Sequence, residues 1–188
     1  MANVDESGPF ETDPRVFISV GHSNRTPEQL VELLREHDVR RLADVRRFPR
    51  SRRFPHFDRG PLSVTLERAA IGYRHFEPLG GYRDGSPDSP HRAWEVDGFR
   101  AYADHMESPE FLNGVKSLFA WGGEGRTAFL CAEKSPRDCH RQLLSDALDV
   151  RGFEVRHAIA PGESVRHERP PFARVEGTRI VYDGGLLF

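Results

Sequence analysis

The amino-acid sequence predicts a single α/β domain built on a mostly parallel, open sheet of about five strands, with helices on both faces. Short apolar, β-branched runs alternate along the chain with longer amphipathic segments. Such a β-α-β order, with two helical segments before the fourth strand, is typical of a parallel sheet. A length of 188 residues suits one hydrophobic core. We therefore expect a Rossmann-like, three-layer architecture.

Five apolar runs are predicted as strands: residues 16–20, 41–46, 72–76, 127–131 and 153–157. The clearest helix follows the first run, because Thr26 is suited to cap it, Pro27 to begin it and Gln29 to complete a capping box. Further helices are predicted over residues 62–70, near 99–106 and 109–121, and from the pattern at 135–138 through 150. The last of these would place Cys139 in the first turn of a capped helix.

The two ends of the chain differ in composition from this core. Residues 1–14 are polar and contain Gly8, Pro9 and Pro14, which predicts a flexible N-terminal tail. The α/β domain is expected over residues 15–160. Residues 161–188 are proline-rich and are expected to form a C-terminal extension, which closes with a small hairpin around Glu176 and Gly177.

Composition narrows the environment and the class of partner. The chain has no apolar run near the roughly 20 residues of a membrane span, no secretory-signal pattern and only two cysteines. We therefore expect a soluble, cytoplasmic protein without a membrane partner. The net charge of −2 excludes a uniformly basic binder, yet only Lys116 and Lys134 of the 27 basic residues are lysine. Arginine suits bidentate binding of phosphate or carboxylate, although a GC-rich genome explains the same excess.

Reactive side chains and glycines follow the ends of the predicted strands. Open α/β sheets bind ligands in the crevice at the carboxyl ends of their strands, so these residues are expected to meet at one edge. The groups that follow the first four strands are His22 and Ser23, then Asp44, Arg46 and Arg47, then Gly80, Gly81 and Tyr82, and finally Cys131 and Glu133.

Four segments of the chain form an ordered set: SVGHSN (19–24), DVRRFPRS (44–51), LGG (79–81), and CAE with CHR (131–133 and 139–141). This set resembles the bacterial and archaeal family catalogued as domain of unknown function 488, and the resemblance covers roughly residues 16–160. It implies that the four segments form the shared site of the family. It brings no established activity with it.

The second segment begins a loop in which arginines and phenylalanines are interleaved. Cations bind phosphates and flat rings stack on bases, so the loop predicts a nucleic-acid or nucleotide partner. The rings expected to stack on bases are Phe48, Phe54 and Phe57. The predicted phosphate or substrate ligands are Ser23, Arg46, Arg47, Arg50, Ser51, Gly80, Gly81, Tyr82 and Arg141. The alternative is a solvated basic loop whose phenylalanines pack on the core.

Three residues are predicted to be catalytic. Glu133 directly follows a buried strand, where a carboxylate has little reason to pack, and it is the first candidate for an acid/base group. His22 is a candidate proton shuttle, although it can instead hydrogen-bond the loop. Asp44 is either a further catalytic carboxylate or the salt-bridge partner of Arg46.

The leading hypothesis is therefore an enzyme that hydrolyses an N-glycosidic bond of a nucleic acid or nucleotide, as a DNA glycosylase does in base-excision repair. Such chemistry needs a carboxylate, flat groups around the base and cations for the phosphates, and we expect no cofactor. A second hypothesis is a thiol- or metal-dependent enzyme that uses Cys131, Cys139 and His140, with His22. A third is a non-catalytic nucleic-acid-binding module. Burial of Cys139 as a packed thiol is the alternative for that residue.

Overall fold

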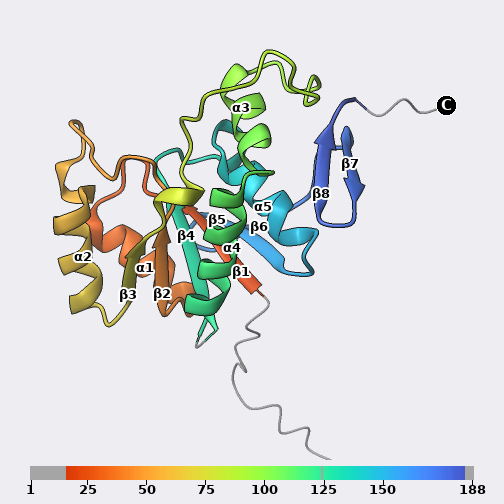
Figure 1. Ribbon diagram of the computed structural model, residues 1–188. Helices are drawn as coiled ribbons and strands as arrows, with labels where there is room; N and C mark the ends of the chain where they lie inside the picture. Colours follow the sequence, from red (N-terminus) through yellow and green to blue (C-terminus); the bar gives the residue numbers. More distant parts are fainter. Residues whose placement is uncertain (1–15, 124, 185–188) are drawn as a thin grey trace, which may run out of the picture.

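A six-stranded sheet with the strand order β3-β2-β4-β1-β5-β6 forms the middle layer of the fold (Figure 1). The computed structural model describes residues 16–123 and 125–184. The strands are β1 (Val16–Gly21), β2 (Arg41–Asp44), β3 (Gly72–His75), β4 (Thr127–Cys131), β5 (Glu154–Ala160) and β6 (Glu163–Arg166). The first five run parallel, and β6 pairs antiparallel with β5. The predicted fold class is confirmed, with one strand more than expected.

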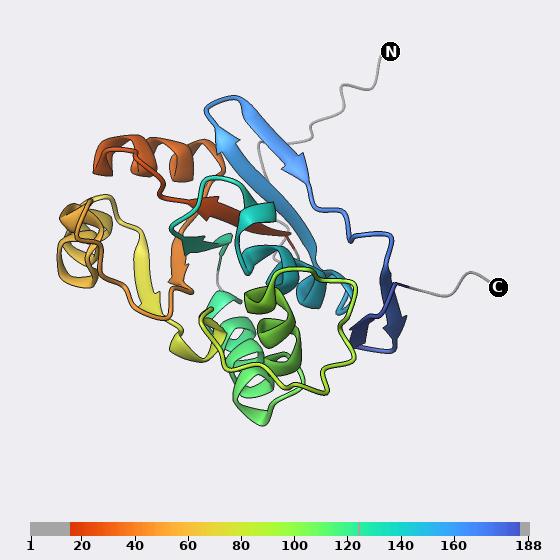
Figure 2. The ribbon, with the colours of Figure 1, turned by 90° about the horizontal axis from the view of Figure 1, so that it is seen from above.

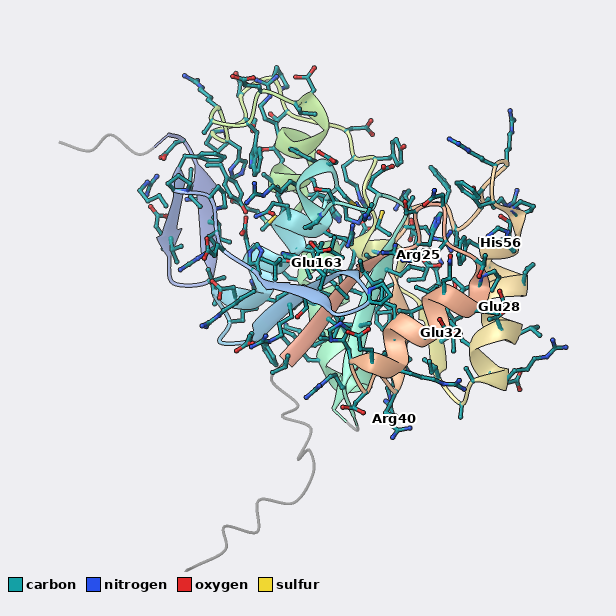
Figure 3. The ribbon with its side chains drawn as sticks, turned by 180° about the vertical axis from the view of Figure 1, so that it is seen from behind. Arg25, Glu28, Glu32, Arg40, His56 and Glu163 are labelled. Atoms are coloured by element: carbon teal, nitrogen blue, oxygen red, sulfur yellow. The ribbon has the colours of Figure 1, made fainter. Side chains whose placement is uncertain are left out.

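Helices cover both faces of the sheet, as the view from above shows (Figure 2). Helices α1 (Pro27–Glu36) and α2 (Arg59–Arg68) lie on one face. Helices α3 (Asp97–His105), α4 (Pro109–Gly122) and α5 (Arg141–Asp149) lie on the other. Side chains alternate between the two faces along each strand, so Phe17 packs with α4 while Ile18 packs with Leu30 of α1. The outer side of α1 carries the exposed Glu28 and Glu32 (Figure 3).

The start of α1 agrees with the capping pattern in the sequence. The Gln29 backbone N–H donates to Thr26 Oγ1 over 3.3 Å, and the Thr26 N–H donates to Gln29 Oε1 over 2.9 Å. Pro27 occupies the first turn, where its missing N–H costs no hydrogen bond. This geometry fixes where the chain turns from β1 into the helix, and it therefore fixes the loop that carries His22 and Ser23.

The segment before α5 differs from the prediction, in which Cys139 lies in a helical turn. The Ser135 hydroxyl caps only a short 3-10 turn, Pro136–Asp138, by accepting from the Arg137 N–H. Cys139 then has an extended backbone, with φ −147° and ψ 150°, and α5 begins at Arg141. The capping residues therefore begin only a single 3-10 turn, and Cys139 lies in the extended link between this turn and α5.

The C-terminal part of the chain adds one strand to the main sheet and then forms a separate hairpin. Residues 163–166, expected in the extension, form the antiparallel edge strand β6, so the α/β fold continues past residue 160. Strands β7 (Ala173–Glu176) and β8 (Arg179–Tyr182) then pair around Glu176 and Gly177 as the suggested hairpin. The predicted tail, residues 1–14, lies outside the described residues. Among the helices of residues 16–184 that the structure describes, none is long and apolar enough to cross a membrane.

Candidate functional site

A pocket of about 450 Å³ opens at the carboxyl ends of β1, β2 and β4. It gathers residues from all four segments that the sequence singled out. The contributions are His22; Arg46, Arg47, Phe48, Arg50 and Ser51; Gly81 and Tyr82; and Cys131, Glu133, Cys139 and His140. Helix α3 closes one side with Gly98 and Phe99, a contribution for which the sequence offered no signal. The pocket thus lies at the edge of the sheet where parallel strands present their loops.

Asp44 and Arg46 form a buried, two-pronged ion pair at the base of this pocket. Asp44 Oδ1 accepts from Arg46 Nε at 2.9 Å and from the Arg46 backbone N–H at 3.1 Å. Asp44 Oδ2 accepts from Arg46 Nη2 at 2.6 Å and from the Tyr73 hydroxyl at 2.8 Å. Because four donors surround this fully buried carboxylate, we assign Asp44 as the partner that positions Arg46 and withdraw it as a catalytic group.

Three residues that line the pocket carry a buried polar atom without a hydrogen-bond partner in the described part of the chain: His22 Nε2, Arg46 Nη1 and Arg47 Nη1. Arg47 Nη1 is ion-paired with Glu77, so Arg46 Nη1 and His22 Nε2 are the two described atoms of this set with neither a hydrogen bond nor an ion pair. His22 Nδ1 lies 3.0 Å from the Ser23 carbonyl, to which its N–H donates, so Nε2 carries the lone pair. Burial and the nearby Arg46 charge lower the pKa of His22 to about 4, which keeps the ring neutral. The pocket therefore offers one cationic donor and one acceptor to a ligand.

Two thiols and an imidazole converge in the same pocket. His140 Nδ1 lies 3.6 Å from Cys139 Sγ and 3.8 Å from Cys131 Sγ. The other ring nitrogen, Nε2, donates to the Val45 carbonyl over 2.9 Å. Both cysteines are free and largely buried, as the packing alternative expected, yet both line the pocket.

The two thiols differ in acidity because they share a hydrogen bond. The bond from Cys131, together with His140, lowers the pKa of Cys139 well below its usual value. The same bond and burial raise the pKa of the Cys131 thiol. Cys139 is therefore the first of the pair to become a thiolate.

Glu133 and Arg141 have opposite environments. The Glu133 side chain is exposed and lines the pocket, and its backbone carbonyl accepts from Arg141 Nη2. Arg141 is wholly buried, and its guanidinium also donates to Ser19 Oγ at 3.0 Å and to the Lys134 carbonyl at 3.2 Å. Arg141, expected to bind an anion, thus holds the loop that presents Glu133.

The aromatic residues of the loop divide into exposed and buried ones. Phe48 is 67% exposed and Tyr82 is 89% exposed, and their ring centroids lie 6.5 Å apart at the mouth of the pocket. Phe57 is fully buried and stacks under His22 at 4.5 Å, so we reassign it from base stacking to the core. Phe54 is half-buried beside the same histidine. Tyr82 was expected only as a substrate ligand, and its exposed ring makes it a better stacking group.

The remaining predicted ligands fall into two groups. Arg47 lines the pocket but is ion-paired with Glu77 and Glu110, whereas Arg50 is exposed at the rim. Ser51 Oγ accepts from the Phe54 N–H and shapes the loop. Ser23 lines a neighbouring hollow of about 660 Å³, into which Glu133 also extends.

The paired glycines serve close packing. A Cβ on Gly80 would lie 2.7 Å from Arg47 Cα, and one on Gly81 would lie 2.9 Å from His140 Nδ1. Of the two, only Gly81 lines the pocket, so Gly80 is assigned to packing rather than to substrate contact.

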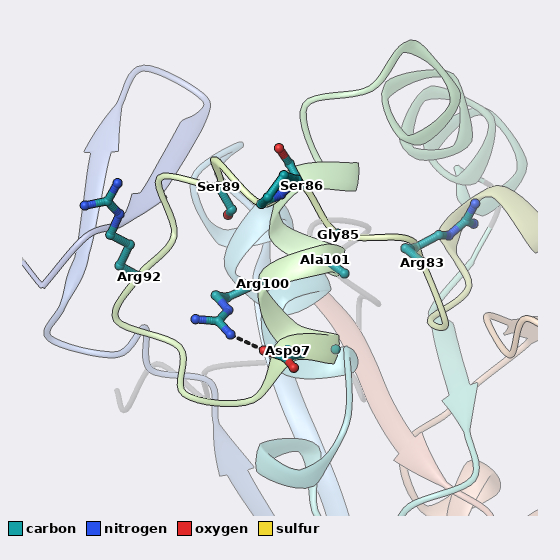
Figure 4. A pocket seen from close by; sticks show the side chains of 10 residues that line it. Arg83, Gly85, Ser86, Ser89, Arg92, Asp97, Arg100 and Ala101 are labelled. Atoms are coloured by element: carbon teal, nitrogen blue, oxygen red, sulfur yellow. Dashed lines mark hydrogen bonds and ion pairs between the residues drawn. The ribbon is translucent and has the colours of Figure 1, made fainter.

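A second arginine-lined hollow, of about 820 Å³, lies between α3 and the loop that precedes it (Figure 4). Arg100 is directed at Asp97, with which it is ion-paired, and Arg83 donates to the Gly80 and Glu77 carbonyls. These two guanidinium groups are already bonded within the protein. The third arginine, Arg92, is exposed, so none of the described arginines of this hollow has a buried, unpartnered nitrogen like Arg46 Nη1 in the pocket at the sheet edge.

Comparison with known proteins identifies a family. The family model described as domain of unknown function DUF488 matches residues 26–148. No curated protein and no solved structure matches the chain. The matched range includes the loop after β2, the paired glycines and both cysteines, while β1 and His22 precede it.

Proposed function

The chain belongs to the DUF488 family, and we propose that it is an enzyme that binds a nucleotide or nucleic-acid substrate in the pocket at the sheet edge and hydrolyses an N-glycosidic bond. The observation that carries the proposal is that Arg46 Nη1 and His22 Nε2, on two residues that line the pocket, are buried with neither a hydrogen bond nor an ion pair in the described part of the chain. Buried polar atoms without partners are costly, and a ligand that supplies partners relieves that cost.

The two atoms are complementary to different chemical groups of a ligand. Arg46 Nη1 is a charged donor and calls for an anionic oxygen, such as that of a phosphate. His22 Nε2 is an acceptor and calls for a hydroxyl or an N–H. A nucleotide carries both, because its phosphate is an anion and its sugar and base bear donors.

The mouth of the pocket supports the same class of ligand. Phe48 and Tyr82 expose two neighbouring rings, and flat rings of this kind stack on bases whatever their sequence. Arg50 is exposed beside them and is suited to a flanking phosphate. Tyr82 has a positive φ of 56°, a strained conformation for a bulky residue, which supports a role at the site rather than in packing.

The proposed catalytic group is Glu133, the exposed carboxylate of the pocket. It accepts a proton from a water molecule while the water oxygen bonds to the anomeric carbon of the sugar. The bond from that carbon to the base nitrogen breaks, and its electron pair leaves with the base, which takes up a proton. Acting on DNA, this reaction is the first step of base-excision repair. We further propose a cytoplasmic location, where reducing conditions keep Cys131 and Cys139 as thiols.

The test is a product assay on single- and double-stranded DNA and RNA that carry normal and modified bases, with free base detected by mass spectrometry. Glu133→Gln is compared with Glu168→Gln, which removes an exposed carboxylate from the neighbouring hollow only. Base release by the wild type and by Glu168→Gln, but not by Glu133→Gln, supports the proposal. Binding without product from the wild type contradicts the enzymatic part and favours a binding module.

One observation favours a second candidate, a thiol-dependent enzyme. Cys139 is the more acidic thiol of a pair, and it lies beside His140 in the same pocket. A Cys139 thiolate is a nucleophile for a covalent intermediate with the same substrate class. This candidate predicts that product formation survives Glu133→Gln and is abolished by Cys139→Ser.

A further inference from the structure

We propose that Cys131, Cys139 and His140 form a binding site for a thiophilic divalent cation, of which Zn²⁺ is the best fit, with a fourth coordination position open to the pocket. The site stands on these three side chains alone, and it does not depend on the nucleotide substrate proposed above.

The three ligand atoms are spaced as a zinc site requires. Cys131 Sγ, Cys139 Sγ and His140 Nδ1 all lie within 4.8 Å of one another, and the two sulfur–nitrogen distances are 3.8 and 3.6 Å. In a tetrahedral site with Zn–S of about 2.3 Å and Zn–N of about 2.0 Å, a sulfur and a nitrogen ligand are separated by about 3.5 Å. Both sulfur–nitrogen distances therefore lie close to the edge length of a zinc tetrahedron, and the two sulfurs lie within 4.8 Å of each other.

The imidazole of His140 is oriented for binding a metal ion. The His140 Nε2–H donates to the Val45 carbonyl over 2.9 Å, so the lone pair of the neutral ring is on Nδ1, the atom that faces both sulfurs. A metal-binding histidine usually donates its other N–H to a carbonyl or a carboxylate in this way, which fixes the tautomer and the ring angle. The ring is further held by Tyr102, whose centroid lies 4.9 Å away.

The backbone around each ligand is held in place by neighbouring segments. Cys131 ends β4 opposite Gly21 of β1, and Cys139 is held by its N–H bond to the Pro136 carbonyl. Gly81 allows the chain to pass close to the His140 ring, where any Cβ would lie 2.9 Å from Nδ1. The ligands are therefore preorganised, and little ordering is needed when the cation binds.

Three protein ligands with an open fourth position are typical of catalytic rather than structural zinc sites. His22 lines the same pocket but does not belong to the group of mutually close ligand atoms, which leaves the fourth position to water or substrate. Zinc lowers the pKa of a bound water to near neutrality. Two thiolates also balance the charge of the cation, which makes its burial favourable.

The test is a Co²⁺ titration of the full-length, reduced and metal-depleted protein, with no substrate present. We expect one Co²⁺ per chain, with thiolate-to-cobalt charge-transfer bands and the intense visible bands of a tetrahedral site, and displacement of both by Zn²⁺. Bound Zn²⁺ should also raise the melting temperature of the wild type. Cys139→Ser and His140→Gln should each weaken binding on the order of 100-fold or more.

The matched controls are His56→Gln, which removes a histidine outside the cluster, and a pair of glycine variants. Gly81→Ala pushes the His140 ring and should weaken Co²⁺ binding. Gly98 lines the same pocket, but a Cβ added there would have no atom within 4 Å. The Gly98→Ala variant should therefore bind Co²⁺ as tightly as the wild type does.

A wild type that shows no charge-transfer band, or that binds Co²⁺ with six-coordinate, thiolate-free spectra, overturns the proposal. So does a wild type in which mild oxidation yields a Cys131–Cys139 disulfide while the reduced form binds no metal, since the pair is then a redox couple. Failure of the product assay for base release leaves the metal site untouched, because the spectra require no substrate.

Discussion

His167 Nε2 lies 2.7 Å from Asp146 Oδ1, deep between α5 and the strand β5. Asp146 Oδ2 also accepts from the Tyr182 hydroxyl at 2.6 Å, so the carboxylate acts as acceptor to both neighbours. His167 therefore donates from Nε2 and accepts at Nδ1, which lies 3.0 Å from His157 Nε2. This buried chain ties the C-terminal hairpin, through Tyr182, to the sheet.

The chain predicts how stability depends on pH. Burial and the neighbouring His167 lower the pKa of His157 to about 3 in the fold, below the ordinary value of 6.5. A depressed pKa contributes stability that is present above pH 6.5 and is lost as the pH falls toward 3. At pH 5 the free energy of unfolding is lowered by about 2 kcal/mol through His157.

The measurement is urea unfolding at pH 7.5 and pH 5. The free energy of unfolding should differ less between the two pH values for His157→Gln than for the wild type, while His56→Gln should keep the wild-type difference. Equal differences in the wild type and His157→Gln would contradict the buried, neutral His157.

The Asp44–Arg46 ion pair predicts a large loss of stability when one partner is removed. Asp44→Asn keeps the shape of the side chain but leaves the buried Arg46 charge without its counter-charge. We expect the free energy of unfolding to fall by about 3–5 kcal/mol. The control is Asp97→Asn, which breaks an exposed pair with Arg100 and should cost about 1 kcal/mol or less. Urea unfolding measures both losses. Comparable losses of free energy in the two variants would contradict the stabilising role assigned to the buried Asp44–Arg46 pair.

Arg141 is predicted to stabilise the loop that presents Glu133. Arg141→Lys keeps the charge but loses the fork that reaches Ser19 and two carbonyls, and it should cost about 3 kcal/mol. Ser19→Ala removes one of these bonds and should cost about 1 kcal/mol. Hydrogen exchange measured by mass spectrometry should show faster exchange over residues 132–138 in Arg141→Lys. Unchanged exchange there would contradict the assigned role.

The exposed aromatic pair is predicted to bind bases. Phe48→Ala and Tyr82→Asn should each weaken binding of single-stranded oligonucleotides by about 1–3 kcal/mol without changing the salt dependence, because an uncharged ring neutralises no phosphate. Asparagine is chosen at position 82 because it tolerates the positive φ. Val96→Ala, an exposed apolar residue of the same pocket, is the control and should bind as the wild type does. Fluorescence anisotropy measures the oligonucleotide affinity of all three variants. An equal loss of affinity in Val96→Ala would mean that general apolar contact, and not stacking on the two rings, accounts for the effect.

The sequence was most informative where local chemistry decides the structure. The apolar runs predicted five parallel strands, and the Thr26 capping pattern predicted the start of α1. Strand β6 was missed because all four of its residues are exposed, so its sequence has neither an apolar run nor alternation. It is a strand only because β5 offers a free edge, and such a tertiary cause has no local signal.

The candidate site was predictable in its location but not in its details. The rule for the carboxyl ends of parallel strands brought His22, Cys131 and Glu133 to one pocket. The sequence offered the salt bridge to Arg46 as one of two roles for Asp44, and the structure shows that ion pair. The role of Arg141 was not predictable, since it depends on partners that folding brings together. Arg141, for example, bonds Ser19, which lies 122 positions away. The sequence pattern predicts which residues lie at the carboxyl edge of the sheet, whereas the packing of the fold determines which of them can face a ligand.

The first measurement is the binding of single-stranded DNA and RNA to the wild type, followed by anisotropy across a salt titration. We expect binding at low salt, a logarithm of the binding constant that falls linearly with the logarithm of the salt concentration, and weaker binding by Phe48→Ala. A wild type that binds neither nucleic acid nor a nucleoside monophosphate at low salt would contradict the assignment of this pocket to a nucleotide.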